Sequence, residues 1–345
     1  MAYTIIDDPT SFFNTVLYTG NATDNRTVTG VGFQPDWSWL KDRTNGNHHR
    51  LYDSVRGATK VIYSSLTNTE GTASDGLKSF DSDGFTLGTG SDENGNSANF
   101  VSWNWLAGGS ASSNSDGDIT SSVSANTTSG FSIVSYTGTG SVATIGHGLG
   151  VAPKLIIVKT RSYSSQAWPV DVRAVDGILY LNETGAKGSY GNSSPFPTTA
   201  PTASVFSVGS PENTNASSAT YIAYCFAEKQ GYSKIGSYTG GSDPFVYLGF
   251  KPAWIMFKNS SASENWRIID NKRDTDNPAA QHLYPNLANA EGSGTSYNDF
   301  VDFLSNGFKI RSGSGEIDGS GNTIIFMAFA ESPFVNSNGI PNNAR

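Results

Sequence analysis

Two parts of the sequence carry the same order of charged side chains: a lysine, an aspartate and an arginine three residues apart, then a glutamate. These residues are Lys41, Asp53, Arg56 and Glu70, and Lys258, Asp270, Arg273 and Glu291. A catalytic carboxylate pair needs one member kept protonated, and a hydrolase gains nothing from repeating that pair. Paired charges with hydrogen bonds do fix loop geometry. We therefore predict a structural framework of salt bridges. The middle of the chain departs from it, with Asp171, Arg173 and Glu183.

Four tryptophans stand in pairs at strand spacing. Trp37 and Trp39 are two residues apart, as are Trp103 and Trp105, so each pair points to one face of its strand. Corresponding positions later in the chain hold other large apolar or aromatic residues. Because these types replace one another, we predict that both pairs pack in a core.

Two further tryptophans, Trp168 and Trp266, stand in less regular segments just before Asp171 and Asp270. Loops at the rim of a sandwich commonly bind ligands. We therefore name Trp168 and Trp266 as candidate glycan-binding residues that stack on a sugar.

Other familiar chemistry lacks its sequence context. Carboxylate-rich loops at 81–84 and 92–96 suggest Ca²⁺ ligands, but the turn at 304–307 that corresponds to the first lacks both carboxylates, which favours a plain turn. The histidines lack zinc-ligand spacing, and no Gly-x-Ser-x-Gly elbow is present. We predict no catalytic, cofactor-binding or metal-binding residue. Cys225, in an apolar run, is predicted to be a buried, inert thiol.

The composition favours strands and argues against several classes of partner. Charged residues make up 15% of the 345 residues, and 38 are glycine. Glycine and asparagine supply turns, while aromatic and β-branched residues suit a half-buried sheet. The formal charge is −8 without a cluster of basic residues, so we expect no nucleic acid partner. No apolar run is long enough for a membrane span, so we expect no membrane insertion.

The elements that must position these residues recur three times along the chain. Each copy opens with Tyr-Thr-Gly, at residues 18–20, 136–138 and 238–240. A glycine, a proline and an apolar run ending in lysine follow, with the prolines at Pro35, Pro153 and Pro252. Proline cannot donate to a sheet ladder, so each is predicted to stand at a strand start. Each copy closes with a second apolar run, at 100–105, 221–226 and 324–329.

This pattern predicts an all-β protein of three tandem, homologous β-sandwich modules, each jelly-roll-like. The predicted divisions are a first repeat at 1–107, a Gly/Ser-rich flexible linker at 108–128, a second repeat at 129–229, a third at 230–332 and a C-terminal tail at 333–345. Asp-Gly at 83–84 and Asn-Gly at 306–307 predict hairpin turns.

The most specific pieces of the repeat are Asp-Gly-Asp-Ile-Thr at 116–120, the run that ends in Tyr-Thr-Gly-Thr-Gly at 136–140, and Gly-His-Gly-Leu-Gly at 146–150. On these pieces, and over nearly its whole length, the sequence resembles a repeat family of structural proteins of marine bacteriophages, often labelled tail-fibre or virion proteins. The resemblance implies a place on the virion exterior with other virion proteins as partners. It carries over no active site.

These observations leave three functions open. The first is a fibre-like element that binds a host cell-surface receptor or glycan. The second is a capsid-decorating protein, since the first repeat begins by about Phe12 and leaves little sequence to grip a tail. The third is a polysaccharide depolymerase, for which no catalytic constellation is found. A homo-oligomer, a trimer by the usual symmetry of fibres, is expected in the first two.

Overall fold

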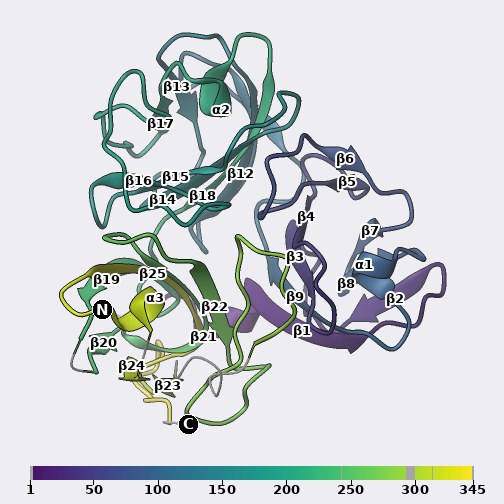
Figure 1. Ribbon diagram of the computed structural model, residues 1–345, viewed down its shortest axis with the longest axis vertical. Helices are drawn as coiled ribbons and strands as arrows, with labels where there is room; N and C mark the ends of the chain where they lie inside the picture. The colour runs from purple at the N-terminus through teal and green to yellow at the C-terminus, as the bar shows by residue number, and fades with distance from the viewer. Residues whose placement is uncertain (1–2, 242, 293–299, 313, 344–345) are drawn as a thin grey trace.

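The computed structural model describes residues 3–241, 243–292, 300–312 and 314–343. Its chain is built from antiparallel strands with a few single-turn helices, so the predicted all-β class is confirmed. Three lobes meet at a common centre (Figure 1). We call them the first lobe (3–107), the middle lobe (108–229) and the third lobe (230–333).

Each lobe contains a sheet with the same strand order. The strands of the first lobe are β1 (Phe13–Thr19), β9 (Asn99–Trp105), β3 (Trp37–Asp42) and β4 (Arg50–Asp53), in that order. Those of the middle lobe are β12 (Phe131–Thr137), β18 (Thr220–Phe226), β14 (Leu155–Thr160) and β15 (Pro169–Val172). Those of the third lobe are β19 (Ser233–Thr239), β25 (Thr323–Pro333), β21 (Phe250–Asn259) and β22 (Trp266–Asp270). We call these the inner sheets.

A smaller sheet lies on the other side of each lobe and completes a sandwich-like unit. The strands of these outer sheets are β2 (Arg26–Thr29), β8 (Gly84–Leu87) and β7 (Leu77–Asp81); β13 (Ala143–Gly146) and β17 (Val205–Val208); and β20 (Phe245–Tyr247), β24 (Gly307–Ser312) and β23 (Phe300–Leu304). A separate apolar cluster fills each sandwich. In the middle lobe β16 (Gly177–Tyr180) follows β15 in the inner sheet, and two more strands, described below, lie beyond β12. The other elements are η1 (Pro9–Ser11), β5 (Lys60–Val61), β6 (Gly71–Thr72) and the single-turn helices α1 (Ser91–Asn94), α2 (Glu212–Asn215) and α3 (Gly315–Asp318).

The Tyr-Thr-Gly motif fastens a short helix to the inner sheet in every lobe. The tyrosine hydroxyl donates to the carbonyl of the third helical residue: Tyr18 to Glu93 at 2.8 Å, Tyr136 to Thr214 at 2.7 Å and Tyr238 to Ile317 at 2.5 Å. The glycine packs so closely on the chain just after the helix that a Cβ atom would lie 2.0 to 2.4 Å from a backbone oxygen. Only glycine fits there, which explains why the motif ends as it does.

The other local predictions agree with the strands. Pro35 and Pro153 stand two residues before β3 and β14, and Pro252 lies at a bulge near the start of β21. Two-residue turns join β7 to β8 and β23 to β24, as the predicted hairpins require. Gly84 begins β8 with a φ of 147°, a conformation that L side chains rarely adopt.

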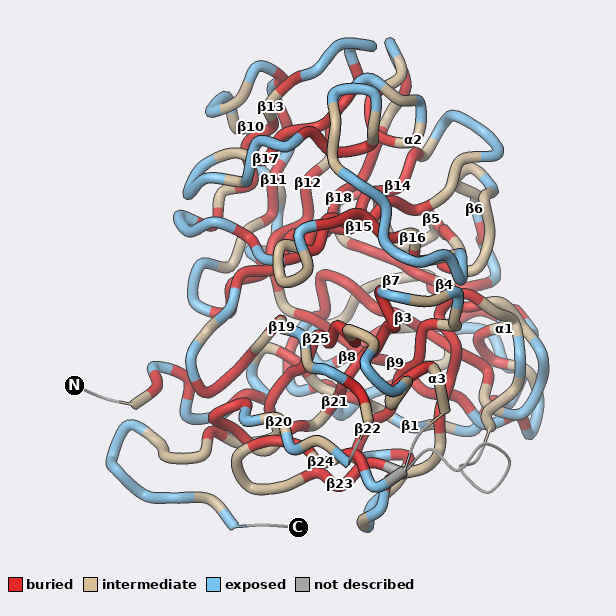
Figure 2. Tube along the Cα trace, turned by 60° about the vertical axis from the view of Figure 1, so that its left-hand side comes forward, coloured by how far each residue is buried: buried red, intermediate tan, exposed pale blue. Residues whose placement is uncertain are grey.

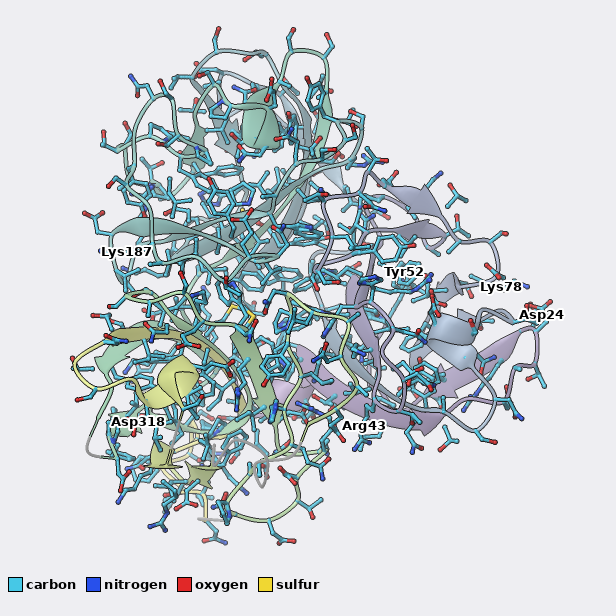
Figure 3. The ribbon with its side chains drawn as sticks, in the orientation of Figure 1. Asp24, Arg43, Tyr52, Lys78, Lys187 and Asp318 are labelled. Atoms are coloured by element: carbon cyan, nitrogen blue, oxygen red, sulfur yellow. The ribbon has the colours of Figure 1, made fainter. Side chains whose placement is uncertain are left out.

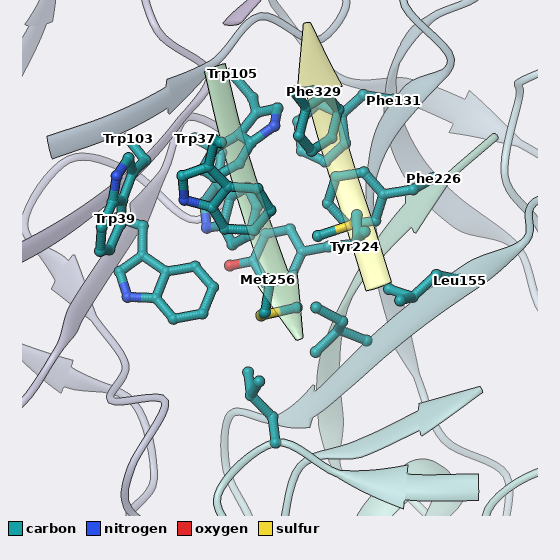
Figure 4. Close-up of a cluster of buried hydrophobic side chains, with 14 of the residues drawn as sticks. Trp37, Trp39, Trp103, Trp105, Phe131, Leu155, Tyr224, Phe226, Met256 and Phe329 are labelled. Atoms are coloured by element: carbon teal, nitrogen blue, oxygen red, sulfur yellow. The ribbon is translucent and has the colours of Figure 1, made fainter. Parts of the chain in front are cut away.

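The three lobes also share one large aromatic core. The faces of the inner sheets turned toward the centre supply it, and its aromatic side chains are Phe13, Trp37, Trp39, Trp103, Trp105, Phe131, Trp168, Tyr224, Phe226, Tyr232, Trp254, Trp266 and Phe329. The Trp37 ring stacks on Tyr224 of the middle lobe at 4.4 Å between centroids (Figure 4). The Trp105 ring meets Trp254 of the third lobe at 5.7 Å. The predicted burial of both tryptophan pairs is confirmed.

Each lobe has an apolar cluster of its own, and the shared cluster joins the lobes with side chains from all three. Figure 2 shows buried chain at the centre of the molecule and exposed chain around the outside. The segment 108–128, predicted as a flexible linker, is instead part of the middle sheet. Its strands β10 (Ser112–Asn114) and β11 (Ser121–Asn126) add to the edge of β12 in regular antiparallel register.

The linker prediction was wrong because glycine- and serine-rich sequence still forms strands where a sheet edge offers backbone partners. Asp36 fixes the entry to this segment, since its carboxylate accepts from the backbone N–H groups of Ala107 and Gly109 at 2.8 and 3.1 Å.

The described part of the tail folds back on the N-terminal segment, where the Ser337 N–H donates to Asp7 at 2.7 Å. Cys225 is fully buried, and burial raises the pKa of its thiol.

Replacing Trp37 with alanine should lower the stability of the whole chain, because the ring contacts two lobes. We expect a loss of about 3–5 kcal/mol in the free energy of unfolding, typical of a large core truncation. Urea unfolding followed by tryptophan fluorescence and by circular dichroism should give one transition that shifts as a unit. Tyr163→Ala, at a half-exposed ring, is the control. Separate transitions of which only one moves would contradict the shared core.

Candidate functional site

The charged residues that recur in the sequence gather where the lobes meet. In the first lobe the Arg56 Nε atom contacts Asp53 at 2.5 Å, and an Nη atom contacts Glu70 at 3.3 Å. In the third lobe Arg273 contacts Asp270 at 2.6 Å and Glu291 at 3.0 Å. The side chains of both aspartates and both arginines are fully buried. The predicted Asp–Arg–Glu framework is confirmed in these two lobes.

Two arginines that the sequence analysis missed extend this framework from one lobe to the next. Arg161 of the middle lobe binds Glu70 of the first lobe through two nitrogens, at 2.8 and 3.1 Å. Arg43 of the first lobe binds Glu291 of the third lobe in the same way, at 3.0 and 2.8 Å. Each arginine stands two residues after the lysine that closes the apolar run, and that shared offset was the signal available in the sequence.

Among the described residues, the interface between the middle and third lobes has no ion pair at the equivalent positions. The Glu70 and Glu291 N–H groups donate to the carbonyls of Arg161 and Arg43, and the Lys187 N–H donates to Ser260 at 2.9 Å in the same way. Lys187 therefore stands where the other lobes have glutamate, and Ser260 where they have arginine. Figure 3 labels Arg43 and Lys187 at these two interfaces.

The buried aspartates also accept hydrogen bonds from the neighbouring lobe. The Tyr224 hydroxyl of the middle lobe donates to Asp53 at 2.7 Å, and the Trp103 indole of the first lobe donates to Asp270 at 3.0 Å. Asp53 and Asp270 face the first residues of their apolar runs across the sheet, and Val172 has that register position in the middle lobe. An apolar residue therefore replaces the carboxylate there.

Asp171, considered as the middle-lobe counterpart, lies one register position away from Val172. It contacts Arg173 at 2.8 Å and accepts from the Tyr190 hydroxyl at 2.6 Å. Burial raises the pKa of the Asp171 carboxyl, and the charge of Arg173 opposes that shift. Glu183 is exposed and has no place in the framework.

The two lysines named in the framework do not pair with its carboxylates, which corrects that part of the prediction. Lys41 donates to backbone carbonyls of Asp42, Asn45 and Ala288, and Lys258 to those of Asn259, Ala262 and Thr184. Ala288 and Thr184 each belong to a neighbouring lobe. An ammonium group suits this role because its three hydrogens can reach carbonyls that the turn leaves unpaired.

Lys159 is the middle-lobe member of this set. Its ammonium donates to Gln166 at 2.8 Å and to Thr67 of the first lobe at 3.1 Å. Burial lowers the pKa of Lys159 to about 7. Burial also lowers the pKa values of Lys41 and Lys258 to about 8, although the charges of nearby carboxylates oppose that shift. Each lysine thus binds a loop of a neighbouring lobe, and the three contacts together link all three lobes.

Trp168 and Trp266 cannot stack on a sugar, so their prediction as glycan-binding residues is wrong. Both side chains are completely buried in the shared core. The Trp168 indole donates to the Leu66 carbonyl of the first lobe at 3.0 Å, and the Trp266 indole to the Tyr180 carbonyl of the middle lobe at 2.9 Å. The sequence marked them as loop residues because Trp168 stands just before β15 and Trp266 begins β22, and both strands are short and end in polar turns.

The carboxylate-rich loops bind parts of the protein itself. Asp83 accepts from the Gly30 and Gly32 N–H groups at 3.1 and 2.6 Å, which explains why it lies at the hairpin turn. In the loop at 92–96, Glu93 accepts from Arg50 at 2.9 Å and from Tyr52, and burial raises its pKa. Within the described ranges, no three His, Cys, Asp or Glu side chains come close enough to hold a metal ion.

Comparison with known proteins identifies the family. A model described as a domain of unknown function, DUF7483, matches residues 8–333. The chain belongs to the DUF7483 family. One DUF7483 match spans all three lobes, consistent with their shared core. Neither a curated protein nor a solved structure matches the chain. In the part of this DUF7483 protein that the structure describes, no helix has the length and apolar character to cross a membrane.

Glu70→Gln should weaken the contact between the first and middle lobes. Burial raises the pKa of Glu70, but the hydrogen bond from Arg161 and the charge of Arg56 shift the pKa below its usual value. The amide would leave Arg56 without its second carboxylate, so we expect a loss of about 1–3 kcal/mol in the free energy of unfolding, measured by urea denaturation. Glu183→Gln, at an exposed position, should change little. Equal effects of the two substitutions would contradict the framework.

Lys159 should make stability rise with pH above neutrality. Its pKa is about 7 in the folded protein, against the ordinary 10.5 expected in the unfolded chain. Between these values the unfolded chain binds more protons, so the contribution of Lys159 grows with pH, by at most about 1.4 kcal/mol per pH unit. Lys159→Met should remove this rise.

The measurement is the free energy of unfolding at pH 7 and at pH 9.5 for wild type and Lys159→Met. The advantage of wild type over the variant should be larger at pH 9.5. Lys154→Met replaces an exposed lysine and is the matched control. A difference that stays constant between the two pH values would show that Lys159 keeps its charge in both states.

Proposed function

We propose that this DUF7483 protein is a non-enzymatic structural protein of a bacteriophage particle, located on the exterior and binding the host surface. The observation that carries the proposal is that the recurring charged groups are occupied in bonds inside the protein, within the lobes and between them. Asp53 pairs with Arg56 and Asp270 with Arg273 within their lobes, and all four side chains are buried. Glu70 and Glu291 each bind an arginine of the adjacent lobe. A protein whose repeated charges pair with one another in the interior is a rigid scaffold, and its outer surface is available for binding. The sequence resemblance to phage structural proteins supports the same function.

A depolymerase is a poorer fit to this arrangement. Glycoside hydrolysis needs two carboxyl groups that flank a sugar bond within reach of water. The recurring aspartates instead lie in the interior, and each is neutralised by an arginine three residues away. Their repetition serves two equivalent positions in the fold.

The arrangement of the lobes favours a capsid-decorating role as the second candidate. Fibre domains follow one another along an axis, whereas these lobes close around one core (Figure 1). A compact body of this kind suits a site on a capsid surface. Under either role we propose that the protein contacts other virion proteins and assembles as a homo-oligomer, with a trimer as the expected form.

Particles that lack this protein should distinguish the two roles. Immunogold labelling of intact particles should first place the protein on the head or on the tail, and its absence from both would refute the proposal. A host-binding element should leave particle stability unchanged when deleted and should lower adsorption to cells. A decorating protein should show the reverse, with heads that lose DNA on heating or at low ionic strength.

A further inference from the structure

The outer sheet of the third lobe carries exposed aromatic rings on a protein that buries most of its other rings. Phe245 and Tyr247 are each 48% exposed, and they are two residues apart on β20. They therefore point to the same side, about 7 Å apart along the strand. Val246 between them points inward and packs against the apolar cluster of the third lobe. The Tyr3 hydroxyl meets the Tyr247 hydroxyl at 3.0 Å at the rim.

The other two lobes show that the fold does not require these rings. Strand register pairs Tyr247 with Gly307 and Phe245 with Lys309. In the first lobe the matching pairs are Thr29 with Gly84 and Thr27 with Thr86, so threonine replaces each ring. In the middle lobe the equivalents of the rings are Gly146 and Thr144, which bind the segment 114–121 through Ser121 and Asp118.

Basic side chains lie on the same face as the rings. Lys309 is opposite Phe245 in the sheet, so their side chains project to the same side, and Arg311 follows two residues along β24. The ammonium of Lys234 lies 5.6 Å from the centre of the Tyr247 ring. The carboxylate of Asp302 pairs with Arg311, and Asp302 lies opposite Lys309 in the sheet. The equivalents of Lys309 are Thr86 in the first lobe and Ser207 in the middle lobe, so the positive charge at this position is particular to the third lobe.

We propose that this face, defined by Phe245, Tyr247, Lys309, Arg311 and Lys234, binds an acidic polysaccharide. Flat aromatic faces stack on the C–H faces of sugar rings, and the ammonium and guanidinium groups pair with carboxylate or sulfate substituents. The patch is positive on a chain whose formal charge is −8, so its charge is local and complements an anionic ligand. This inference names the ligand class for the proposed host-surface binding and rests on that function for its biological source.

Single-stranded nucleic acid also stacks on aromatic rings beside basic groups. Non-specific binding of nucleic acid relies on many phosphate contacts, whereas this face offers three basic groups, one of which pairs with Asp302. A chain of uronic acids presents the C–H faces of its sugars to the rings and a carboxylate on each sugar to the basic groups. The acidic polysaccharide is therefore the better match, and nucleic acid becomes an outcome of the test.

The test titrates the purified full-length protein with polygalacturonate oligomers in a calorimeter, with neutral dextran and oligothymidylate as comparison ligands. Wild type should bind polygalacturonate and should not bind dextran. Phe245→Thr/Tyr247→Thr, which copies Thr27 and Thr29 of the first lobe, should weaken binding by at least about tenfold. Lys309→Thr should weaken it by a smaller factor and should reduce its dependence on salt.

Tyr163→Thr is the matched control, because Tyr163 is a half-exposed ring of the middle lobe and should not affect binding. Urea unfolding of each variant establishes that it is folded, as the threonines of the first lobe lead us to expect. Undiminished binding by the double variant would overturn the proposal. So would absence of polygalacturonate binding by wild type, or tighter binding of oligothymidylate. None of these results depends on where the protein lies on a particle, so the proposed function can fail separately.

Discussion

The packing of three inner sheets against one aromatic core constrains nearly every other feature of this protein. Trp37, Trp105, Tyr224, Trp254 and Phe329 come from different lobes and meet within one contiguous cluster. Each lobe can bury the central face of its inner sheet only against the other two. Apolar area removed from water is the main favourable term in folding, so the lobes are stable as a set. This dependence explains why large aromatic residues concentrate on β3, β9, β18, β21 and β25.

A closed arrangement of this kind creates polar groups that water cannot reach. Turns at the lobe interfaces bring carbonyl groups inside, and an unpaired buried carbonyl is unfavourable. Lys41, Lys159 and Lys258 satisfy them, even though burial lowers the pKa values of all three. Arg43 and Arg161 provide the second set of fastenings through carboxylates of the adjacent lobe. The repeated lysine, aspartate, arginine and glutamate residues, which are types that enzymes use in catalysis, therefore hold the lobes together.

The differences between lobes are as informative as the similarities. Where all three lobes have the same residue type, as in Tyr-Thr-Gly, a contact of the fold accounts for it. Where one lobe departs, the fold permits the change, and some departures have no structural role. Lys187 and Ser260 remove an ion pair that two interfaces keep, while Phe245 and Tyr247 place rings where the first lobe has threonine. Phe245 and Tyr247 are at the surface, which is why we propose them as ligand-binding residues.

The sequence by itself determined the all-β class, the positions of the main strands and the hairpin turns, because glycine, proline and apolar runs act through local backbone geometry. It also determined the pairing of Asp53 with Arg56 and of Asp270 with Arg273, since three residues separate each pair. Only the tertiary structure decided that Trp168 and Trp266 are buried and that residues 108–128 join a sheet. It alone decided that the lysines bind carbonyls of another lobe. These outcomes depend on contacts between residues that are distant in sequence. A local sequence pattern does not show which side chains a neighbouring lobe will bury.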